Sequence, residues 1–596
     1  MKTSKIILKN QNPVLQIDGE EFPSCAYITY FEERNDYKAF AERSFRIYSI
    51  SISFADQPIN TASGFKPYLG GVFDEKGKAD FSVVDNSIKE ILKACPNAYI
   101  FPRIYVCMPQ WWIDENPTET VDVPRGKKRE IIFSHKFRTD AAKMLKELIE
   151  HLKSCPESDH IFGYQISGGN TQEWFHLDLK GSYCENSLYY FNEYLKKKYP
   201  NKPPVSELPP LDEVGGNDII KNPLLTEYLR FANEEVAVTV DYLCKAAKEA
   251  VDYKQVVGAF YGYVSEVRSP LWGTHAPSKL LDSPNIDFFS SPNSYFKSRA
   301  MGYEWGDMMP VDSMKLHGKM CFIECDVRTF LSRSPDNSRK GSDPLNYYSN
   351  AVWMGPPDEE QSVWAVRKSL ARQLTHTHGL WWFDMFGHWY ASEKLMDEME
   401  NSLKLYNLSI KENPLNFPVE VAVFLDETSY SKVGTSYQMP IPPNTLRDIL
   451  AKCGIPYNVY LIEDFDTLVN NGFEFKSVIF AVPFKSQKIQ EAVDFCKVNN
   501  IGCLCAGEGK ELYAIEDFED LFDNSGVWRY TKENDIFYIG NGFFAIHAVN
   551  EGIKTVTFPK DVKIISLNYD SNEQVCSEFD IKMQRFETQI YKIEKV

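Results

Sequence analysis

Short runs of β-branched and aromatic residues alternate with helical patterns over about 370 residues of this chain. Eight runs are present, at residues 25–30, 47–53, 99–107, 161–166, 256–261, 286–290, 320–324 and 379–384. The segment 139–154 illustrates the helical pattern, with apolar residues at i, i+3 and i+4 before Cys155-Pro156 ends it. Eight strands joined by helical crossovers predict a (β/α)8 barrel. Because such barrels typically span ~250 residues, we expect insertions after strands four and seven.

The chain has 596 residues, which is too long for one hydrophobic core. After the barrel, a second alternation of strands and helices predicts a flavodoxin-like α/β domain. It lacks the motifs G-x-G-x-x-G and G-x-x-x-x-G-K-[ST], so we expect a structural or assembly role rather than nucleotide binding. The predicted domains are a barrel with a short N-terminal segment (1–413), the flavodoxin-like domain (414–524) and a small β-sandwich (525–596).

The composition of the chain limits the kinds of ligand and cellular location that we expect. The chain carries 65 Lys and Arg against 83 Asp and Glu, a net charge of −18, which disfavours nucleic acids and anionic membranes. Aromatic residues make up 14%, a surplus that often lines clefts. The 13 cysteines form no C-x-x-C pair, and the start of the chain lacks the apolar core of a signal peptide. We therefore expect reduced thiols, a cytoplasmic location and no metal site, although Cys503 and Cys505 leave metal binding as an alternative to core packing.

Two predicted strands end in glutamates. Glu173 follows strand four in the sequence IFGYQISGGNTQEWFH, and Glu324 ends strand seven in KMCFIECDVRTF. In a (β/α)8 barrel, catalytic groups lie at the carboxyl ends of strands, and strands four and seven lie nearly opposite each other across the barrel mouth. Two carboxyls separated by ~5 Å suit a retaining glycosidase, whereas ~6.5–9.5 Å suits an inverting one.

The same ends of the strands are rich in groups that suit a sugar, because aromatic rings cover its C–H faces and polar side chains pair with its hydroxyls. Expected substrate contacts are Arg103, Trp112, Asn170, Gln172, Trp174, Tyr263, Tyr295, Trp382, Asp384 and His388. Trp111, Tyr261, Trp381 and Trp389 lie nearby, and alternation along strand eight leaves open which of Trp381 and Trp382 faces the barrel.

Structural alternatives exist for several of these residues. Glu173 is alternatively a surface carboxylate, and Glu324 an ion-pair partner of Arg103 or Arg328. Arg103 itself is alternatively a buried anchor, and His388 a structural histidine. The substitute carboxyls to consider are Glu304, Glu266 and Asp326, of which Asp326 is expected to support the site through Arg328.

Four segments together resemble a known group of enzymes: IYVCMPQWW at strand three, GGNTQEW at strand four, FIECDVRT at strand seven and GLWWFDMFGHWY at strand eight. They are similar to clan A glycoside hydrolases, especially the family 42 β-galactosidases and relatives that include a β-mannosidase family. Those enzymes carry a barrel, a flavodoxin-like trimerisation domain and a small β-domain, so the resemblance spans nearly the whole chain. It implies that Glu173 is the acid/base, that Glu324 is the nucleophile, and that the protein is a homotrimer. In one departure, Gln172 occupies the place where the clan usually has Asn.

The expected function is therefore that of a retaining, exo-acting β-glycosidase that cleaves β-galactosides through a covalent glycosyl-enzyme and needs no cofactor. A β-mannosidase is the first alternative, because Gln172 points to an altered 2-position of the sugar. A non-catalytic carbohydrate-binding or assembly protein is the alternative of another class.

Overall fold

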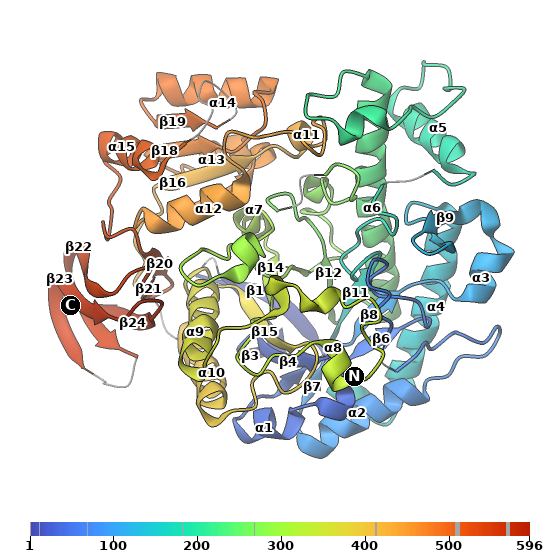
Figure 1. Ribbon diagram of the computed structural model, residues 1–596, viewed down its shortest axis with the longest axis horizontal. Helices are drawn as coiled ribbons and strands as arrows, with labels where there is room; N and C mark the ends of the chain where they lie inside the picture. The colour runs from blue at the N-terminus through green and yellow to red at the C-terminus, as the bar shows by residue number, and fades with distance from the viewer. Residues whose placement is uncertain are drawn as a thin grey trace.

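The predicted (β/α)8 barrel is confirmed (Figure 1). The computed structural model describes residues 2–10, 12–67, 69–180, 183–266, 269–411, 414–506, 513–567 and 572–596. In chain order, the barrel strands are β4 (Cys25–Thr29), β5 (Ile47–Tyr48) with β6 (Ser51–Ser53), β7 (Tyr99–Ile100) with β8 (Arg103–Val106), β11 (Gly163–Gly168), β12 (Val256–Phe260), β13 (Phe288–Ser290), β14 (Met320–Cys325) and β15 (Gly379–Asp384). Strands two and three are each interrupted once, so β5 pairs with β7, and β6 pairs with β8. All pairings between these strands are parallel, and β15 pairs with β4 to close the ring.

Helices cover the outside of the barrel. The longest are α2 (Ser82–Ala94), α4 (His135–Ser154), α6 (Pro223–Ala250), α9 (Glu359–Thr375) and α10 (Glu393–Lys411). Helix α4 begins four residues before the predicted start, because the Ser134 side chain accepts a hydrogen bond from the Phe137 amide and caps it. Among the described residues, no helix has both the length and the apolar character that a membrane span requires.

The two tryptophans of strand eight, Trp381 and Trp382, point to opposite sides of the barrel wall. Trp381 points into the barrel, where its ring lies 5.0 Å from Phe322 and 5.8 Å from Phe260 between centroids. Trp382 points outward, and its Nε1 donates to Ser402 Oγ on α10 at 3.2 Å. Trp381 therefore belongs to the barrel core, and Trp382 packs beneath a helix.

A second parallel sheet follows the barrel. Its strands β16 (Val421–Leu425), β17 (Tyr457–Leu461), β18 (Ser477–Phe480) and β19 (Gly502–Cys505) have the spatial order β17-β16-β18-β19. The connecting helices include α12 (Pro443–Lys452), α13 (Phe465–Asn470) and α14 (Gln487–Val498), and α15 (Ile515–Ser525) follows the last strand. The order 2-1-3-4 is that of the flavodoxin-like fold without its fifth strand. Figure 1 shows these elements in orange, beside the barrel.

The C-terminal strands form one antiparallel sheet rather than two separate layers. They are β20 (Ile536–Gly540), β21 (Phe543–His547), β22 (Gly552–Ser566), β23 (Glu573–Met583) and β24 (Thr588–Lys595), in the order β20-β21-β24-β22-β23. The register of β22 shifts between Thr557 and Val562, so this long strand changes its pairing along its length. The sheet packs against α9 of the barrel (Figure 1). The domain boundaries remain predictions, and residue 413 lies outside the described residues.

The N-terminal strands β1 (Ser4–Lys9), β2 (Asn12–Ile17) and β3 (Glu20–Phe22) form a small antiparallel sheet. Ser4 Oγ accepts from the Val256 amide at 2.9 Å and donates to the Phe162 carbonyl. Since residues 162 and 256 lie at the starts of strands four and five, this sheet attaches to the bottom of the barrel. The opposite, carboxyl ends of the strands are left for a site.

Candidate active site

A cavity of about 390 Å³ lies at the carboxyl ends of the barrel strands. Its polar lining residues are Asn60, Arg103, Asn170, Thr171, Glu173, Glu324 and Asn350. The remaining lining residues are apolar or aromatic, and many come from loops after strands two, four, five and seven. This volume falls within the range of small-molecule sites in proteins. The two glutamates predicted from the strand ends therefore share one cavity.

Glu324 forms a buried ion pair. Its Oε2 lies 2.8 Å from Arg103 Nη1, and the two side chains are 6% and 2% exposed. The Arg103 guanidinium also lies over the Phe260 ring, 4.3 Å from its centroid. Arg103 is thus both the ion-pair anchor considered from the sequence and a residue of the cavity wall.

The loop that carries Glu173 folds back on strand four. The Trp174 amide donates to the Gly168 carbonyl at 2.8 Å, and the Asn170 amide donates to the Phe175 carbonyl at 2.8 Å. Thr171, Gln172 and Trp174 have positive φ angles of 58°, 68° and 60°. Non-glycine residues adopt this conformation at a cost, so the surrounding contacts must hold the loop in place.

Strand four ends in a glycine because of the same loop. The Trp174 ring lies against Gly168, where an added β-carbon would lie 2.6 Å from it. The Trp174 Nε1 donates back to the Ile166 carbonyl at 3.1 Å. The close packing of ring on backbone therefore fixes the direction in which Glu173 leaves the strand.

One hydroxyl donates to the Glu173 carboxyl, and a second acts on its pKa. Thr171 Oγ1 donates to Glu173 Oε2, and the nearby Tyr263 hydroxyl also lowers the pKa of the carboxyl. Glu173 retains some exposure because it faces the cavity, although protein surrounds it. Removal of the carboxyl from bulk water raises the pKa of Glu173 to about 7.

Burial and several neighbouring charges act on the pKa of Glu324. Burial raises the pKa of Glu324 to about 8, and the charges of Asp326 and Glu173 act in the same direction, whereas Arg103 lowers it. By these values alone, Glu324 would hold its proton longer than Glu173. We assign the charge the other way, because only Glu324 has a guanidinium in hydrogen-bonding contact. A single negative charge shared by the pair therefore resides mainly on Glu324, and Glu173 holds the proton.

Two further predicted contacts line the cavity. Asn170 accepts hydrogen bonds at Oδ1 from the Thr61 amide at 2.8 Å and from Thr61 Oγ1 at 3.0 Å. The Tyr295 hydroxyl donates to Asp326 Oδ2 at 2.8 Å. Asp326 is fully buried, and Arg328 Nη1 lies 2.7 Å from its Oδ2. The expected supporting role of Asp326 through Arg328 matches these contacts.

Other predicted contacts lie behind the cavity wall. Gln172 is fully buried, and its Oε1 accepts from the Tyr30 hydroxyl at 3.3 Å. Trp174 packs under the strand-four loop, and Tyr263 contacts Glu173 from behind. These three residues position groups of the cavity wall, and none of them is itself part of the lining.

Four predicted contacts are directed away from the cavity. Trp112 lies on α3 (Gln110–Glu115) and donates to Asp140 of α4 at 3.0 Å. Trp382 faces α10, as described above. Asp384 accepts from the Tyr27 hydroxyl and from the amides of His388 and Trp389, so it caps the turn after strand eight. His388 Nδ1 hydrogen-bonds Asp36 Oδ1 at 2.9 Å. The structure therefore assigns these four residues to packing and turn formation.

The substitute carboxyls are held elsewhere by arginines. Arg372 Nη1 lies 2.7 Å from Glu304 Oε1, and Arg447 Nη2 lies 2.6 Å from Glu266 Oε2. Arg447 belongs to α12, so the second pair ties the barrel to the flavodoxin-like sheet. Neither Glu304 nor Glu266 lines the cavity.

Several lining residues were missed by the sequence reasoning. They are the aromatic residues Tyr30, Phe65, Phe175, Trp272, Tyr347, Tyr348, Trp353 and Phe383. Tyr30 and Phe383 lie at the ends of strands one and eight, and strand position alone could have identified them. The others belong to loops, whose path no periodicity in the sequence reveals.

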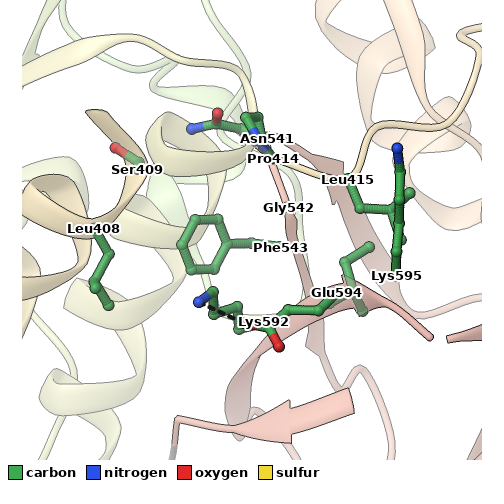
Figure 2. A pocket seen from close by; sticks show the side chains of 11 residues that line it. Leu408, Ser409, Pro414, Leu415, Asn541, Gly542, Phe543, Lys592, Glu594 and Lys595 are labelled. Carbon is green, nitrogen blue, oxygen red and sulfur yellow. Dashed lines mark hydrogen bonds and ion pairs between the residues drawn. The ribbon is translucent and has the colours of Figure 1, made fainter. Parts of the chain in front are cut away.

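A second cavity, of about 290 Å³, lies between α10, the segment after it and the C-terminal sheet (Figure 2). Figure 2 shows Phe543 pointing toward Leu408. Glu594 is the one carboxylate among its eleven lining residues, and its Oε1 lies 2.8 Å from Lys592 Nζ. This cavity therefore lacks the paired carboxyls found at the barrel mouth. Among the described residues, no group of three or more His, Cys, Asp or Glu side chains is placed to hold a metal ion.

Neither a family model nor a curated protein sequence matches the chain. Solved structures do resemble it. The β-galactosidase from Rahnella sp. R3 has a TM-score of 0.64 at 12% identity, with 96% of this chain and 98% of that chain covered. A catalytic mutant of Gan42B, a GH42 β-galactosidase from G. stearothermophilus, gives 0.61 at 11% identity, covering 96% and 98%. The β-galactosidase from Marinomonas ef1 gives 0.58 at 9%, covering 95% and 99%. At such low identities the likeness is one of fold, and it extends over nearly the whole chain.

The packing of Trp174 on Gly168 predicts the effect of one methyl group. In Gly168→Ala the new β-carbon would overlap the ring, so the variant should lose about 1–3 kcal/mol of stability. The midpoint of thermal or urea unfolding measures this loss. Gly215→Ala is the matched control, because a β-carbon there meets nothing within 4 Å. Equal midpoints for the two variants would contradict the packing argument.

Proposed function

We propose that this chain is a retaining, exo-acting β-glycosidase that cleaves β-D-galactosides. The observation that carries the proposal is the pair of carboxyls in one cavity, of which Glu324 is paired with Arg103 and Glu173 accepts from the neutral Thr171 hydroxyl. Environments that separate the roles of two carboxyls are typical of glycosidases. The overall fold, shared with solved β-galactosidases, supports the same class.

In the proposed mechanism, Glu324 attacks the anomeric carbon while Glu173 donates its proton to the leaving oxygen. The glycosyl ester neutralises Glu324, which removes its repulsion of Glu173 and lowers the pKa of that carboxyl. Glu173 then takes a proton from water, and the water oxygen displaces Glu324 from the sugar. No cofactor takes part in these steps.

Exo action follows from the shape proposed for the site. Tyr347, Tyr348 and Trp353, from the long segment after strand seven, line the cavity together with the strand-end residues. A site walled in this way accepts one end of a saccharide rather than the middle of a chain.

The flavodoxin-like region carries no nucleotide motif, and its proposed role is assembly of a homotrimer. Light scattering should then give about three times the chain mass of 68.6 kDa.

A β-D-mannosidase is the second candidate, and Gln172 is the observation that favours it. The Gln172 amide is buried against Tyr30 rather than exposed in the cavity, so it makes no direct contact with an equatorial 2-hydroxyl. We retain the galactoside because nearby residues such as Asn170 line the cavity. A panel of 4-nitrophenyl β-glycosides tests the choice. The galactoside should have the highest kcat/KM, and a tenfold advantage for the mannoside would reverse the order of the two candidates.

Glu324 is expected to be the nucleophile. Glu324→Gln should lower turnover at least ~10³-fold, because the attacking group and its charge both disappear. A 2-fluoro glycoside should label Glu324 in the wild type, and peptide mass spectrometry locates the label. A label on Glu304 or Glu266 in folded protein would reject the assignment. A protein that binds sugars but cleaves no aryl glycoside would instead belong to the non-catalytic class.

Glu173 is expected to be the acid/base. Glu173→Ala should slow substrates with poor leaving groups far more than those with good ones, because only the former need a proton. Added azide should partly restore its turnover of aryl glycosides. Equal losses for both kinds of substrate, without azide rescue, would mean that another group donates the proton.

The pH profile of the wild type should reflect the same group. The reaction needs protonated Glu173, whose pKa is raised to about 7, so kcat/KM should fall as pH rises through that value. Glu173→Ala should lose this basic limb for substrates with good leaving groups. A limb that persists in the variant would belong to a different ionisation.

A further inference from the structure

The cavity has few polar groups to offer a second sugar ring. Nine of its 21 lining residues are aromatic, five are aliphatic and seven are polar. Five of the polar residues, Arg103, Asn170, Thr171, Glu173 and Glu324, belong to the carboxyl pair or to the loop that carries it. Asn60 and Asn350 lie away from this cluster. The lining also has four tyrosine hydroxyls, and those of Tyr30, Tyr295 and Tyr348 are already hydrogen-bonded within the protein.

Each of those two asparagines uses one end of its side-chain amide within its own loop. Asn60 Oδ1 accepts from the amides of Ala62 and Ser63, both at 2.9 Å. Asn350 Nδ2 donates to the Tyr347 carbonyl at 2.9 Å. A second pyranose in the cavity would therefore leave most of its hydroxyls without protein partners, which weakens binding.

Four apolar lining residues are attached to the segment that carries Glu173, and we call them the Trp272 wall: Ile59, Phe175, Leu179 and Trp272. The Ile59 carbonyl accepts from the Thr171 amide at 2.7 Å, so Ile59 adjoins the loop of the acid/base. On the other side, Phe175 lies two residues after Glu173, and its ring meets Trp272 at 5.1 Å and 67°. The Trp272 carbonyl accepts from the His176 amide at 3.0 Å, which fixes it to the same loop.

The position of this wall decides which part of a substrate it would contact. In the proposed mechanism Glu173 protonates the oxygen of the leaving group, so that group must lie beside Glu173. The leaving group consequently meets the Trp272 wall. A flat aromatic ring can stack or pack edge-on against these side chains and needs no hydroxyl partners.

We propose that the Trp272 wall is an aglycone site that selects substrates with an aromatic leaving group, that is, aryl β-glycosides of phenolic compounds, over disaccharides. The proposal rests on the proposed function, because it takes Glu173 as the proton donor. It adds the chemical class of the leaving group, which the sugar at the carboxyl pair does not determine.

Two comparisons test the aglycone proposal, one between substrates and one between thio-linked compounds. All of these compounds carry the sugar that gives the highest kcat/KM in the 4-nitrophenyl panel. Phenol and 2-naphthol have similar acidity, so phenyl and 2-naphthyl glycosides differ mainly in the apolar area that they present. The wild type should cleave the 2-naphthyl glycoside with a kcat/KM about tenfold higher, because a second ring is buried. It should also bind the 2-naphthyl thioglycoside, which resists hydrolysis, at least tenfold more tightly than a thio-linked disaccharide.

Trp272→Ala is the diagnostic variant, and Trp272→Phe is its conservative partner. Trp272→Ala should lower kcat/KM for the 2-naphthyl glycoside ~10- to 100-fold and for the methyl glycoside less than threefold, and Trp272→Phe should restore most of the loss. Trp528→Ala is the control, because Trp528 is 41% exposed and does not line the cavity. Thermal midpoints close to that of the wild type verify that each variant folds.

The outcomes separate this proposal from the proposed function. Labelling of Glu324 together with disaccharide binding as tight as that of the naphthyl compound would overturn the aglycone site and leave the glycosidase intact. An equal loss for methyl and naphthyl glycosides in Trp272→Ala would also overturn it, because Trp272 would then act on the loop of Glu173. Absence of cleavage and of labelling with every glycoside would overturn both.

Discussion

The ion pair between Arg103 and Glu324 is the interaction on which the rest of the site depends. Two charges buried at the centre of a barrel are costly unless they meet in good geometry, and here Nη1 and Oε2 lie 2.8 Å apart. The pair joins strand three to strand seven across the barrel, and Phe260 of strand five supports the guanidinium from its face. By holding one carboxyl as an anion, Arg103 leaves the proton of the pair for Glu173. A difference in chemistry between two identical functional groups thus arises from one neighbouring cation.

The position of Glu173 depends on backbone strain rather than on charge. Three non-glycine residues around it have positive φ, and hydrogen bonds on both sides of the loop hold them there. Such strain persists only where the surroundings determine the conformation, and Trp174 packed on Gly168 provides much of that determination. The loop brings the Glu173 carboxyl, which accepts from the neutral Thr171 hydroxyl, to the edge of the cavity. A more relaxed turn would let Glu173 reach solvent and lower its pKa.

The sequence predicted the repeated strands of the barrel, but it did not predict the cavity residues that come from loops. All eight barrel strands were located, and strand eight at Gly379–Asp384 was placed to the residue, because buried parallel strands are continuous apolar runs between helical segments. Glu173 and Glu324 were brought to one cavity because strand ends converge. Trp382, Asp384 and His388 were misplaced for a local reason, since one strand residue in two points outward and the turn after strand eight uses its polar groups internally. Trp272 and Trp353 were missed because their loops have no period from which a direction could be read.

This division between strands and loops has a chemical consequence. The charged groups that would break a glycosidic bond come from strand ends and from one short loop, whose positions are fixed by the closed hydrogen-bonding of the barrel. The apolar groups that would recognise what is attached to the sugar come from the residues that follow Glu173 and from segments after strands two and five, whose paths the barrel does not constrain. A fold of this kind can therefore keep one bond-breaking geometry while its leaving-group surface changes from polar to aromatic. In this chain the surface beside Glu173 is aromatic and aliphatic, and the Asn60 and Asn350 side chains each make a hydrogen bond within their own loops. The selectivity of the cavity should accordingly reside more in Trp272 and its neighbours than in the carboxyl pair.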